Sequence, residues 1–363
     1  MEKKVAFISE GFIESNDKTG GSILNTEFLK RLVSLGYKVD VYSGRFENIT
    51  NLMSNYYSLD ELENVDLRSK YDYVLSDQAI YESDITYIHS HSYKYRIEKL
   101  QTKLTQLTYK LISSRHHKKR VMADIKIKEN LDKIPQIVVS SFFLKKDYMQ
   151  NLGVAEEKLV ILPPPVINVK APNFRAKGKT VIFGLAANGF VNKGGYITIS
   201  ALRKLKRKSK DFKVRIIYEK ARKNFGLQFL LFIYGLKNHV EFLPTQYDMN
   251  EFYKSLDFML VPSKIETFSM VAIEAMAHFK PVVVSSVCGV TDYVKDSVNG
   301  YCVDYEKGNK SANLAAKMLN AIQLSSEAYE TIAKAAAKTV EPLTLDNFVN
   351  GYFEILSSRK LKD

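Results

Sequence analysis

Short apolar runs alternate with longer amphipathic stretches along the first half of the chain. Lys3 to Glu10 is a short apolar run typical of a strand buried on both faces, whereas Ser22 to Gly36 places apolar residues at helical spacing. Strands that alternate with helices in this way favour a doubly wound parallel sheet. Further strands of this kind are predicted at 37–44, 71–77, 84–91, 134–141 and 158–165.

Three consecutive prolines at 163–165 interrupt this alternation, and a polar, turn-rich stretch follows them. The length of 363 residues also favours two domains. We therefore predict an N-terminal Rossmann-like domain over 1–166, a C-terminal one over 167–343, and a helix over 344–363 that crosses back to the first domain. In the second domain, strands are predicted at 180–187, 213–219, 239–244, 257–263, 281–287 and 300–304.

Two glutamates, Glu266 and Glu274, lie eight positions apart in a segment that is otherwise mostly apolar. Between two predicted strands, Thr267 to Phe279 predicts a helix with Thr267 as its N-cap and Pro281 after its end. Open α/β sheets bind ligands at such strand ends, and a helix start binds phosphate. A buried carboxylate needs a hydrogen-bond donor, for which a sugar or ribose hydroxyl is a candidate. The structural alternative is that Glu266 caps the helix and Glu274 pairs with a lysine from another strand.

This segment resembles the EX7E motif of the retaining family 4 glycosyltransferases. Their motif is commonly written E-T-F-G-x-x-x-x-E-A-M-A, and this chain has E-T-F-S-M-V-A-I-E-A-M-A, followed by a Pro-initiated strand and a Gly loop. The resemblance implies the GT-B architecture, two doubly wound Rossmann-like α/β domains facing a cleft, with the acceptor bound by the first and the nucleotide sugar by the second. It also implies that Glu266 contacts donor sugar hydroxyls and that Glu274 holds the nucleotide ribose. The backbone amides that would meet the diphosphate or the sugar are those of Thr267, Phe268 and Ser269.

Two glycine-containing loops are further candidates for binding the donor diphosphate. Gly20 and Gly21 follow the first strand and open the first long helix, although a plain turn is the alternative. In the resembled family this loop lies over the diphosphate. The family also binds the diphosphate with an Arg and a Lys five positions apart. Lys193 matches the Lys, but Asn188 stands at the Arg position and brings no charge, and Phe279 stands where the family prefers Gly.

Two histidines, His89 and His91, end the predicted strand over 84–91, and strand alternation predicts that both lie on one face. A metal pair would need further ligands, and no convergent Cys, His or Asp is visible nearby in the sequence. A structural role for at least one histidine is the alternative. Because the resembled family often places a histidine here, near the donor sugar, His91 and His89 join Glu266 as candidate catalytic residues.

The formal net charge of +13 is concentrated in two segments. Residues 94–133 hold twelve Lys or Arg against four acids, and residues 203–223 hold eleven against two. Apolar residues recur at helical spacing within 97–111, which predicts either a helix packed on a core or a basic amphipathic helix on an anionic membrane surface. Nucleic acid is not expected, because no reading helix, stacking platform or zinc site accompanies the charge.

The longest nearly uncharged apolar run, Phe225 to Leu236, is about half of the roughly 20 residues that a membrane span needs. It predicts a buried helix, with a membrane-facing patch as the alternative. Two cysteines, Cys288 and Cys302, give no disulfide framework, and the charged first residues do not resemble a signal peptide. We therefore expect a cytoplasmic protein, with peripheral attachment to the cytoplasmic face of the inner membrane through 94–133 as a further hypothesis.

Together these features predict a retaining hexosyltransferase that uses a nucleotide diphosphate sugar, with a UDP-sugar favoured. The acceptor would be a glycan or a lipid-linked molecule of bacterial cell-surface polysaccharide biosynthesis, as in the similar lipopolysaccharide-core enzymes. We expect no cofactor, and metal-independent transfer, because no D-x-D motif stands at a strand end. The alternatives are a GT-B-shaped sugar-nucleotide epimerase and a non-catalytic scaffold of the same fold.

Overall fold

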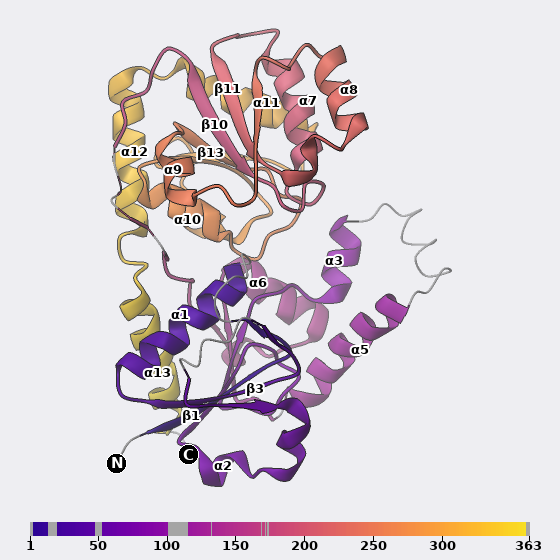
Figure 1. Ribbon diagram of the computed structural model, residues 1–363, viewed down its shortest axis with the longest axis vertical. Coiled ribbons are helices and arrows are strands. Elements are labelled where there is room, and N and C mark those ends of the chain that lie inside the picture. The colour runs from indigo at the N-terminus through magenta and orange to yellow at the C-terminus, as the bar shows by residue number, and fades with distance from the viewer. Residues whose placement is uncertain are drawn as a thin grey trace. The chain divides into compact units, whose positions relative to one another are not determined.

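The computed structural model describes residues 3–13, 20–47, 53–100, 115–131, 133–167, 169–170, 172 and 174–360. The chain forms two compact units, the first from Met1–Ile167 with Leu343–Asp363 and the second from Asn168–Pro342. The divisions lie one residue from the positions predicted from the sequence. Each unit is built on one large parallel sheet with helices packed against it (Figure 1). The predicted α/β class with two doubly wound domains is confirmed.

The sheet of the first unit has seven parallel strands in the order β5-β3-β1-β6-β7-β8-β9. The chain runs outward from β1 on one side and from β6 on the other, so the order reverses between these two strands. Ligands of open sheets bind beyond the carboxyl ends of the strands at such a reversal. The strands are β1 (Lys4–Ser9), β3 (Lys38–Ser43), β5 (Asn55–Ser58), β6 (Tyr73–Ser76), β7 (Ile85–Ile88), β8 (Gln136–Val139) and β9 (Leu159–Ile161), and a small second sheet pairs β2 (Phe12–Ile13) with β4 (Phe46–Glu47).

Central strands of this sheet are buried on both faces, which explains their unbroken apolar runs. In β1, every residue from Val5 to Ser9 is buried. The helices described in this unit are α1 (Gly20–Ser34), α2 (Leu67–Lys70), α3 (Tyr93–Leu100), α5 (Arg115–Asn130), α6 (Phe142–Asp147) and α13 (Leu345–Lys360).

The C-terminal helix α13 packs against α1 of the same unit. The ring of Phe28 lies 5.6 Å from that of Phe348 and 4.9 Å from that of Tyr352, measured between centroids. Arg31 Nε donates to Asp346 Oδ1 at 2.7 Å beside these rings. The chain therefore returns to its first unit after forming the second.

The sheet of the second unit has six parallel strands in the order β12-β11-β10-β13-β14-β15. Its order reverses between β10 and β13, which makes the carboxyl ends of those two strands the expected place for a ligand. The strands are β10 (Val181–Ala186), β11 (Phe212–Ile217), β12 (Val240–Leu243), β13 (Phe258–Val261), β14 (Val282–Ser285) and β15 (Gly300–Val303). The helices are α7 (Gly195–Leu205), α8 (Phe225–Ile233), α9 (Met249–Lys254), α10 (Met270–Ala277), α11 (Lys310–Gln323) and α12 (Ser326–Val340).

Helix α10 begins three residues later than predicted, so Thr267 is not its N-cap. The reason lies in the preceding carbonyls, which accept hydrogen bonds from outside the helix. Glu266 O accepts a hydrogen bond from Gly289 N–H at 3.1 Å, and Phe268 O accepts one from Val290 N–H at 3.0 Å. Ser269, the residue before the helix, has a φ of 102°, which no helical residue adopts.

The C-terminal end of α10 explains the family's preference for glycine where this chain has phenylalanine. Phe279 N–H donates to Met276 O and Lys280 N–H donates to Ala275 O, both at 2.9 Å, which is the pattern of a Schellman motif. That motif places Phe279 in the left-handed region, with a φ of 59°, where glycine is unstrained. Its ring packs edge-on against Phe174 at 6.3 Å, a contact that glycine would lack.

Helix α8 contradicts the prediction that the apolar run Phe225 to Leu236 forms a buried helix. Leu227 and Leu231 are buried, but Phe225 is 86% exposed and Phe229 is 62% exposed. Within the described ranges, no helix has the length and apolar character that crossing a membrane would require.

Candidate functional site

In the second unit, the loop after β13 brings together two of the predicted site residues. Glu266 Oε2 accepts hydrogen bonds from Lys193 Nζ and, at 3.2 Å, from Ser263 Oγ. Lys193 follows β10, the strand that pairs directly with β13. Two side chains 73 positions apart in the sequence thus meet at the carboxyl edge of the sheet, where the strand order reverses.

The Lys193–Glu266 ion pair is partly open to solvent, with 37% and 17% of the two side chains exposed. Water screens such a pair, so its contribution to stability is about 1 kcal/mol or less. Both charged groups can therefore exchange this contact for a bound ligand at small cost.

Gly194 allows the Lys193 loop to approach the loop after β13. A Cβ added at Gly194 would lie 1.9 Å from the carbonyl oxygen of Pro262, and the residue has a φ of 76°. The same contact is reinforced by Lys264 N–H, which donates to Asn192 O at 2.9 Å. A glycine is required here by both the space and the backbone conformation.

Glu274 lies near the middle of α10 and faces a tyrosine. Tyr253 Oη donates to Glu274 Oε2 at 2.6 Å. Burial raises the pKa of Glu274 to about 7, although the hydrogen bond from Tyr253 partly offsets that rise. The alternative in which Glu274 pairs with a lysine is therefore wrong, because its partner is Tyr253. The glutamate that pairs with a lysine is Glu266.

The remaining predicted donor residues surround the same edge of the sheet. Asn188 is exposed in the loop that also carries Lys193. The ring of Phe268 is buried and packs edge-on against Tyr293 at 5.7 Å, which fixes the backbone at Thr267 to Ser269. Ser269 Oγ is buried and has no hydrogen-bond partner among the described residues.

Replacing Ser269 with glycine should stabilise the protein. Glycine adopts the same positive φ without strain, and the change also removes a buried hydroxyl that has no partner among the described residues, so we expect the free energy of unfolding to rise by about 1–2 kcal/mol. Urea unfolding of Ser269→Gly measures this. Ser297→Gly is the matched control, because Ser297 has a φ of 63° but is exposed and should gain less. A loss of stability in Ser269→Gly would contradict the account.

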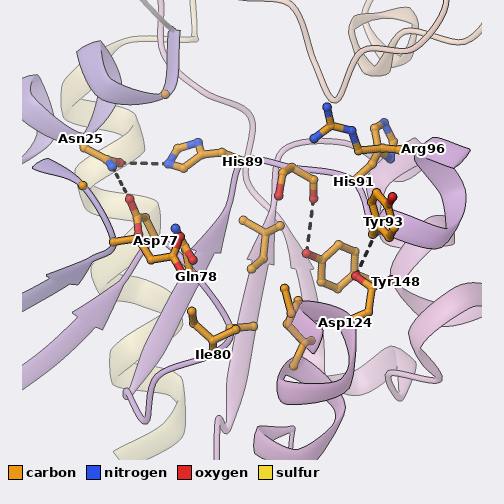
Figure 2. A pocket seen from close by; sticks show the side chains of 18 of the residues that line it. Asn25, Asp77, Gln78, Ile80, His89, His91, Tyr93, Arg96, Asp124 and Tyr148 are labelled. Atoms are coloured by element: carbon orange, nitrogen blue, oxygen red, sulfur yellow. Dashed lines mark hydrogen bonds between the residues drawn. The ribbon is translucent and has the colours of Figure 1, made fainter. Parts of the chain in front are cut away.

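In the first unit, a cavity of about 380 Å³ lies at the carboxyl ends of β1, β6 and β7, beside the reversal in strand order. Figure 2 shows Asn25, Asp77 and His89 along one wall and His91, Tyr148 and Asp124 along the other. Of the predicted residues, the cavity lining includes Gly21, His89 and His91 but not Gly20.

One wall of this cavity is a chain of hydrogen-bonded side chains. Asn25 Nδ2 donates to Asp77 Oδ2 at 2.8 Å, and Asn25 Oδ1 lies 2.9 Å from His89 Nε2. Burial lowers the pKa of His89 to about 4, so this imidazole is neutral near pH 7. Burial also raises the pKa of Asp77 to about 6, against the hydrogen bonds from Ser9 and Asn25. Asp77 Oδ1 is buried without a partner among the described residues.

The other wall contains His91, held by an aspartate. His91 Nδ1 lies 2.8 Å from Asp147 Oδ2, and Ser92 Oγ donates to Asp147 Oδ1 at 2.6 Å. Burial alone would raise the pKa of Asp147, but the hydrogen bonds from His91 and Ser92 lower it below its usual value. His91 is 7% exposed, and its Nε2 has no partner among the described residues.

The prediction that His89 and His91 share one strand face is wrong. Strand β7 ends at Ile88, so alternation does not extend to either histidine. They bond to partners from different elements, Asn25 of α1 and Asp147 of α6, and so occupy different walls of the cavity.

Sequence reasoning missed Asp77, Asp147 and Tyr253 as site residues. Asp77 carried a usable signal, because it is the last residue of the strand predicted over 71–77, at the sheet edge where ligands bind. Asp147 and Tyr253 carried none, since each meets its partner across 56 and 21 positions respectively and neither belongs to a motif.

Part of the basic segment 94–133 lies outside the described residues, which omit 101–114 and 132 and the side chains of 98–100 and 115–120. Its prediction as a membrane surface therefore stays a prediction. In the described part of the chain, His, Cys, Asp and Glu side chains form no group of three or more that could hold a metal ion.

Comparison with known proteins identifies the second unit. The family model of the group 1 glycosyl transferases matches residues 168–339. The D-inositol 3-phosphate glycosyltransferase of Salinispora arenicola is 33% identical over 123 residues, 33% of this chain and 27% of that protein. An uncharacterized glycosyltransferase of Methanocaldococcus jannaschii is 31% identical over 146 residues, 38% of each chain. The matched part spans well under half the length of these relatives.

Solved structures resemble the chain over almost its whole length. WaaG, a glycosyltransferase involved in lipopolysaccharide biosynthesis, matches with a TM-score of 0.77 at 16% identity over 97% of this chain and 99% of WaaG. HepE of Anabaena, in complex with UDP and glucose, matches with a TM-score of 0.71 at 16% identity over 98% and 100%. At this identity the likeness concerns the fold. The second unit thus matches the group 1 glycosyl transferases, and the two units have the GT-B fold.

Proposed function

We propose that this protein is a retaining glycosyltransferase that moves a hexose from a nucleotide diphosphate sugar to a glycan or lipid-linked acceptor of the bacterial surface. The observation that carries the proposal is the contact between Lys193 and Glu266 at the carboxyl edge of the second sheet, with Glu274 on the helix that follows the same loop. The family match over residues 168–339 supports it. A UDP-sugar is the favoured donor, which agrees with the UDP and UDP-glucose named in the HepE structures.

Each of the three charged residues has a proposed contact with the donor. Glu274 accepts a hydrogen bond from a ribose hydroxyl while Tyr253 continues to donate to the same carboxylate. Glu266 accepts from hydroxyls of the donor sugar, and Lys193 turns from Glu266 towards the diphosphate. Positive charge fixed beside the departing diphosphate stabilises the negative charge that develops there, and so lowers the barrier to transfer.

Backbone and neutral groups complete the proposed donor site. The amides of Thr267, Phe268 and Ser269 precede α10, where the positive end of the helix dipole favours a phosphate or a sugar oxygen. Asn188 contributes a hydrogen bond in place of the family's arginine. A role for Gly20 and Gly21 at the start of α1 in diphosphate binding stays a prediction.

For the acceptor we propose the cavity of the first unit, because both of its walls present groups that bind hydroxyls. Asp77 Oδ1 and His91 Nε2 are buried polar atoms without partners among the described residues, so a bound hydroxyl would satisfy each of them. His91 is accordingly the histidine that we propose to contact substrate, with Asp147 as a positioning residue that orients its ring. His89 is hydrogen-bonded to Asn25, which in turn donates to Asp77. We propose that His89 positions these two side chains and does not contact the substrate itself.

Product analysis by mass spectrometry tests the reaction class. A transferase produces an acceptor heavier by one hexose residue and releases the nucleoside diphosphate. An epimerase would instead yield a nucleotide sugar of unchanged mass, and a scaffold of this fold would change neither substrate. Retention of the anomeric configuration in the product, and undiminished rates in EDTA, test the retaining and metal-independent parts of the proposal.

A further inference from the structure

Helix α8 presents two opposite apolar faces, of which only one is covered. Leu227 and Leu231 are 0% and 2% exposed and pack into the second unit. The other face begins with Phe225. Residues four, seven and eight positions after it lie on the same side of a helix, and all four carry large apolar side chains. These are Phe225 at 86% exposure, Phe229 at 62%, Phe232 at 65% and Ile233 at 51%.

The position of α8 in the fold explains why this face is uncovered. The helix connects β11 to β12, and β12 is the edge strand of the sheet. Its neighbour in the same unit is α7, which it meets near both of its ends. Asn224 Nδ2 lies 3.4 Å from Tyr196 Oη, and Lys206 Nζ donates to Gly235 O at 2.7 Å. Figure 1 shows the two helices together, on the side of the second unit away from α12.

Cations lie beside the exposed aromatic face or just before it in the chain. Between residues 220 and 238 the chain has four Lys or Arg and no Asp or Glu. Lys237 Nζ lies 5.1 Å from the ring centroid of Phe232, and the Arg203 guanidinium lies 4.6 Å from that of Tyr234. We name as the α8 surface the four exposed apolar residues together with the exposed cations Arg203, Lys220, Arg222, Lys223 and Lys237.

We propose that the α8 surface docks onto an anionic lipid bilayer, with α8 lying in the plane of the interface. A cluster of large exposed apolar side chains is uncommon on a soluble protein unless it binds something. Phenylalanines rimmed by Lys and Arg match both layers of a bilayer surface, because the rings enter the acyl boundary while the cations meet phosphate headgroups. The absence of any acid between 220 and 238 favours this partner over a protein surface of mixed charge.

This surface is separate from the basic segment 94–133 and belongs to the other unit. It does not depend on the proposed transferase activity, because binding to lipid can be measured without donor or acceptor. The acids Asp211 and Glu219 are the exposed negative groups of the preceding stretch, and both lie outside the span of α8.

The chain contains no tryptophan, so a single introduced indole reports on one site. With the whole 363-residue chain, we expect the emission of Phe229→Trp to shift to the blue when vesicles of phosphatidylcholine with roughly 30% phosphatidylglycerol are added, and to be quenched when those vesicles carry brominated lipid. Val298→Trp is the matched control, because Val298 is 54% exposed in the same unit and should show neither change. Equal responses at the two positions, or no response at Phe229→Trp, would overturn the proposal.

Vesicle flotation measures the contribution of each part of the surface. We expect Phe225→Ser/Phe229→Ser/Phe232→Ser to lose at least about tenfold in binding, with an unchanged melting temperature because these rings are exposed. Lys220→Gln/Arg222→Gln/Lys223→Gln should lose a similar factor, and its residual binding should no longer weaken with salt. Lys334→Gln/Lys338→Gln on α12 is the charge control and should bind like the original protein.

Three outcomes of the flotation experiment would overturn the proposal. The first is that the original protein binds neutral and anionic vesicles equally well, or binds neither kind. The second is binding that is retained in both α8 variants but lost when the basic residues of 115–120 are neutralised. The third is a concentration-dependent self-association that Phe229→Ser abolishes without any vesicle binding, which would assign the surface to a second copy of this chain.

Discussion

Glu274→Gln is expected to lower the rate of donor turnover by roughly tenfold to a hundredfold while leaving the fold intact. The substitution keeps the shape of the side chain but removes the charge that would accept a ribose hydroxyl, and hydrogen bonds to charged groups contribute about 1.5–3 kcal/mol. The initial rate of nucleotide release from the donor, measured at several donor concentrations, gives the change in kcat/KM. Glu274→Ala, which removes the acceptor oxygens altogether, should abolish turnover.

Glu251→Gln on α9 is the matched control, because Glu251 is an exposed glutamate that pairs with neighbouring Lys254. It should retain full activity. Full activity in Glu274→Gln and Glu274→Ala would remove the basis for assigning the ribose contact, and with it the assignment of this loop as the donor site.

The same carboxyl predicts a pH dependence of stability. Its pKa is raised from 4.5 to about 7 in the folded protein, so between these values the folded chain holds a proton that the unfolded chain releases. The stabilisation from this group is complete below pH 4.5 and is lost as the pH rises through 7. The loss is on the order of 3 kcal/mol. Urea unfolding at pH 5 and pH 8 should therefore show a smaller fall in stability for Glu274→Gln than for the original protein.

Gly194→Ala is expected to destabilise the protein by at least about 3 kcal/mol and to disturb the Lys193–Glu266 contact. The added methyl group would meet the Pro262 carbonyl at 1.9 Å, and alanine is also strained at a φ of 76°. Because the obstacle is backbone, relief requires the whole Lys193 loop to move away from the loop after β13. Urea unfolding gives the loss of stability, and donor turnover gives the effect on the site.

Gly189→Ala provides the control within the same loop. A Cβ at Gly189 would meet nothing within 4 Å, and its backbone lies outside the left-handed region. We expect its free energy of unfolding to stay within about 1 kcal/mol of the original value. If the two alanine variants were equally stable, the close approach of the two loops would not be a feature of the folded protein.

The two sheets could be predicted from the sequence because their strands are buried on both faces. Such strands must be continuous apolar runs, as in Val5 to Ser9, and a pattern of this kind is visible without any knowledge of packing. The start of α10 could not be predicted in the same way. Glu266 O is bonded to Gly289, 23 positions later, and that distant partner decides where the helix begins.

The exposure of α8 was likewise beyond sequence reasoning. An apolar composition is the same for a helix buried on both faces and for one that leads to the edge strand β12 and is covered on one face only. The candidate site likewise contains some residues that the sequence predicted and others that only the structure revealed. The family resemblance predicted that Lys193 and Glu266 lie near one ligand, whereas Tyr253 and Asp147 became visible only through their contacts with Glu274 and His91.

The central claim, that the second unit binds a nucleotide sugar through Glu274, is tested most directly by calorimetric titration of UDP into the original protein and into Glu274→Gln. We predict a single site in the original protein, with binding that tightens from pH 6 to pH 8 as the carboxyl of pKa about 7 ionises. In Glu274→Gln the affinity should fall at least about tenfold and lose this pH dependence. Equal affinities in the two proteins, or no binding of UDP or any other nucleotide diphosphate by the original one, would contradict the account.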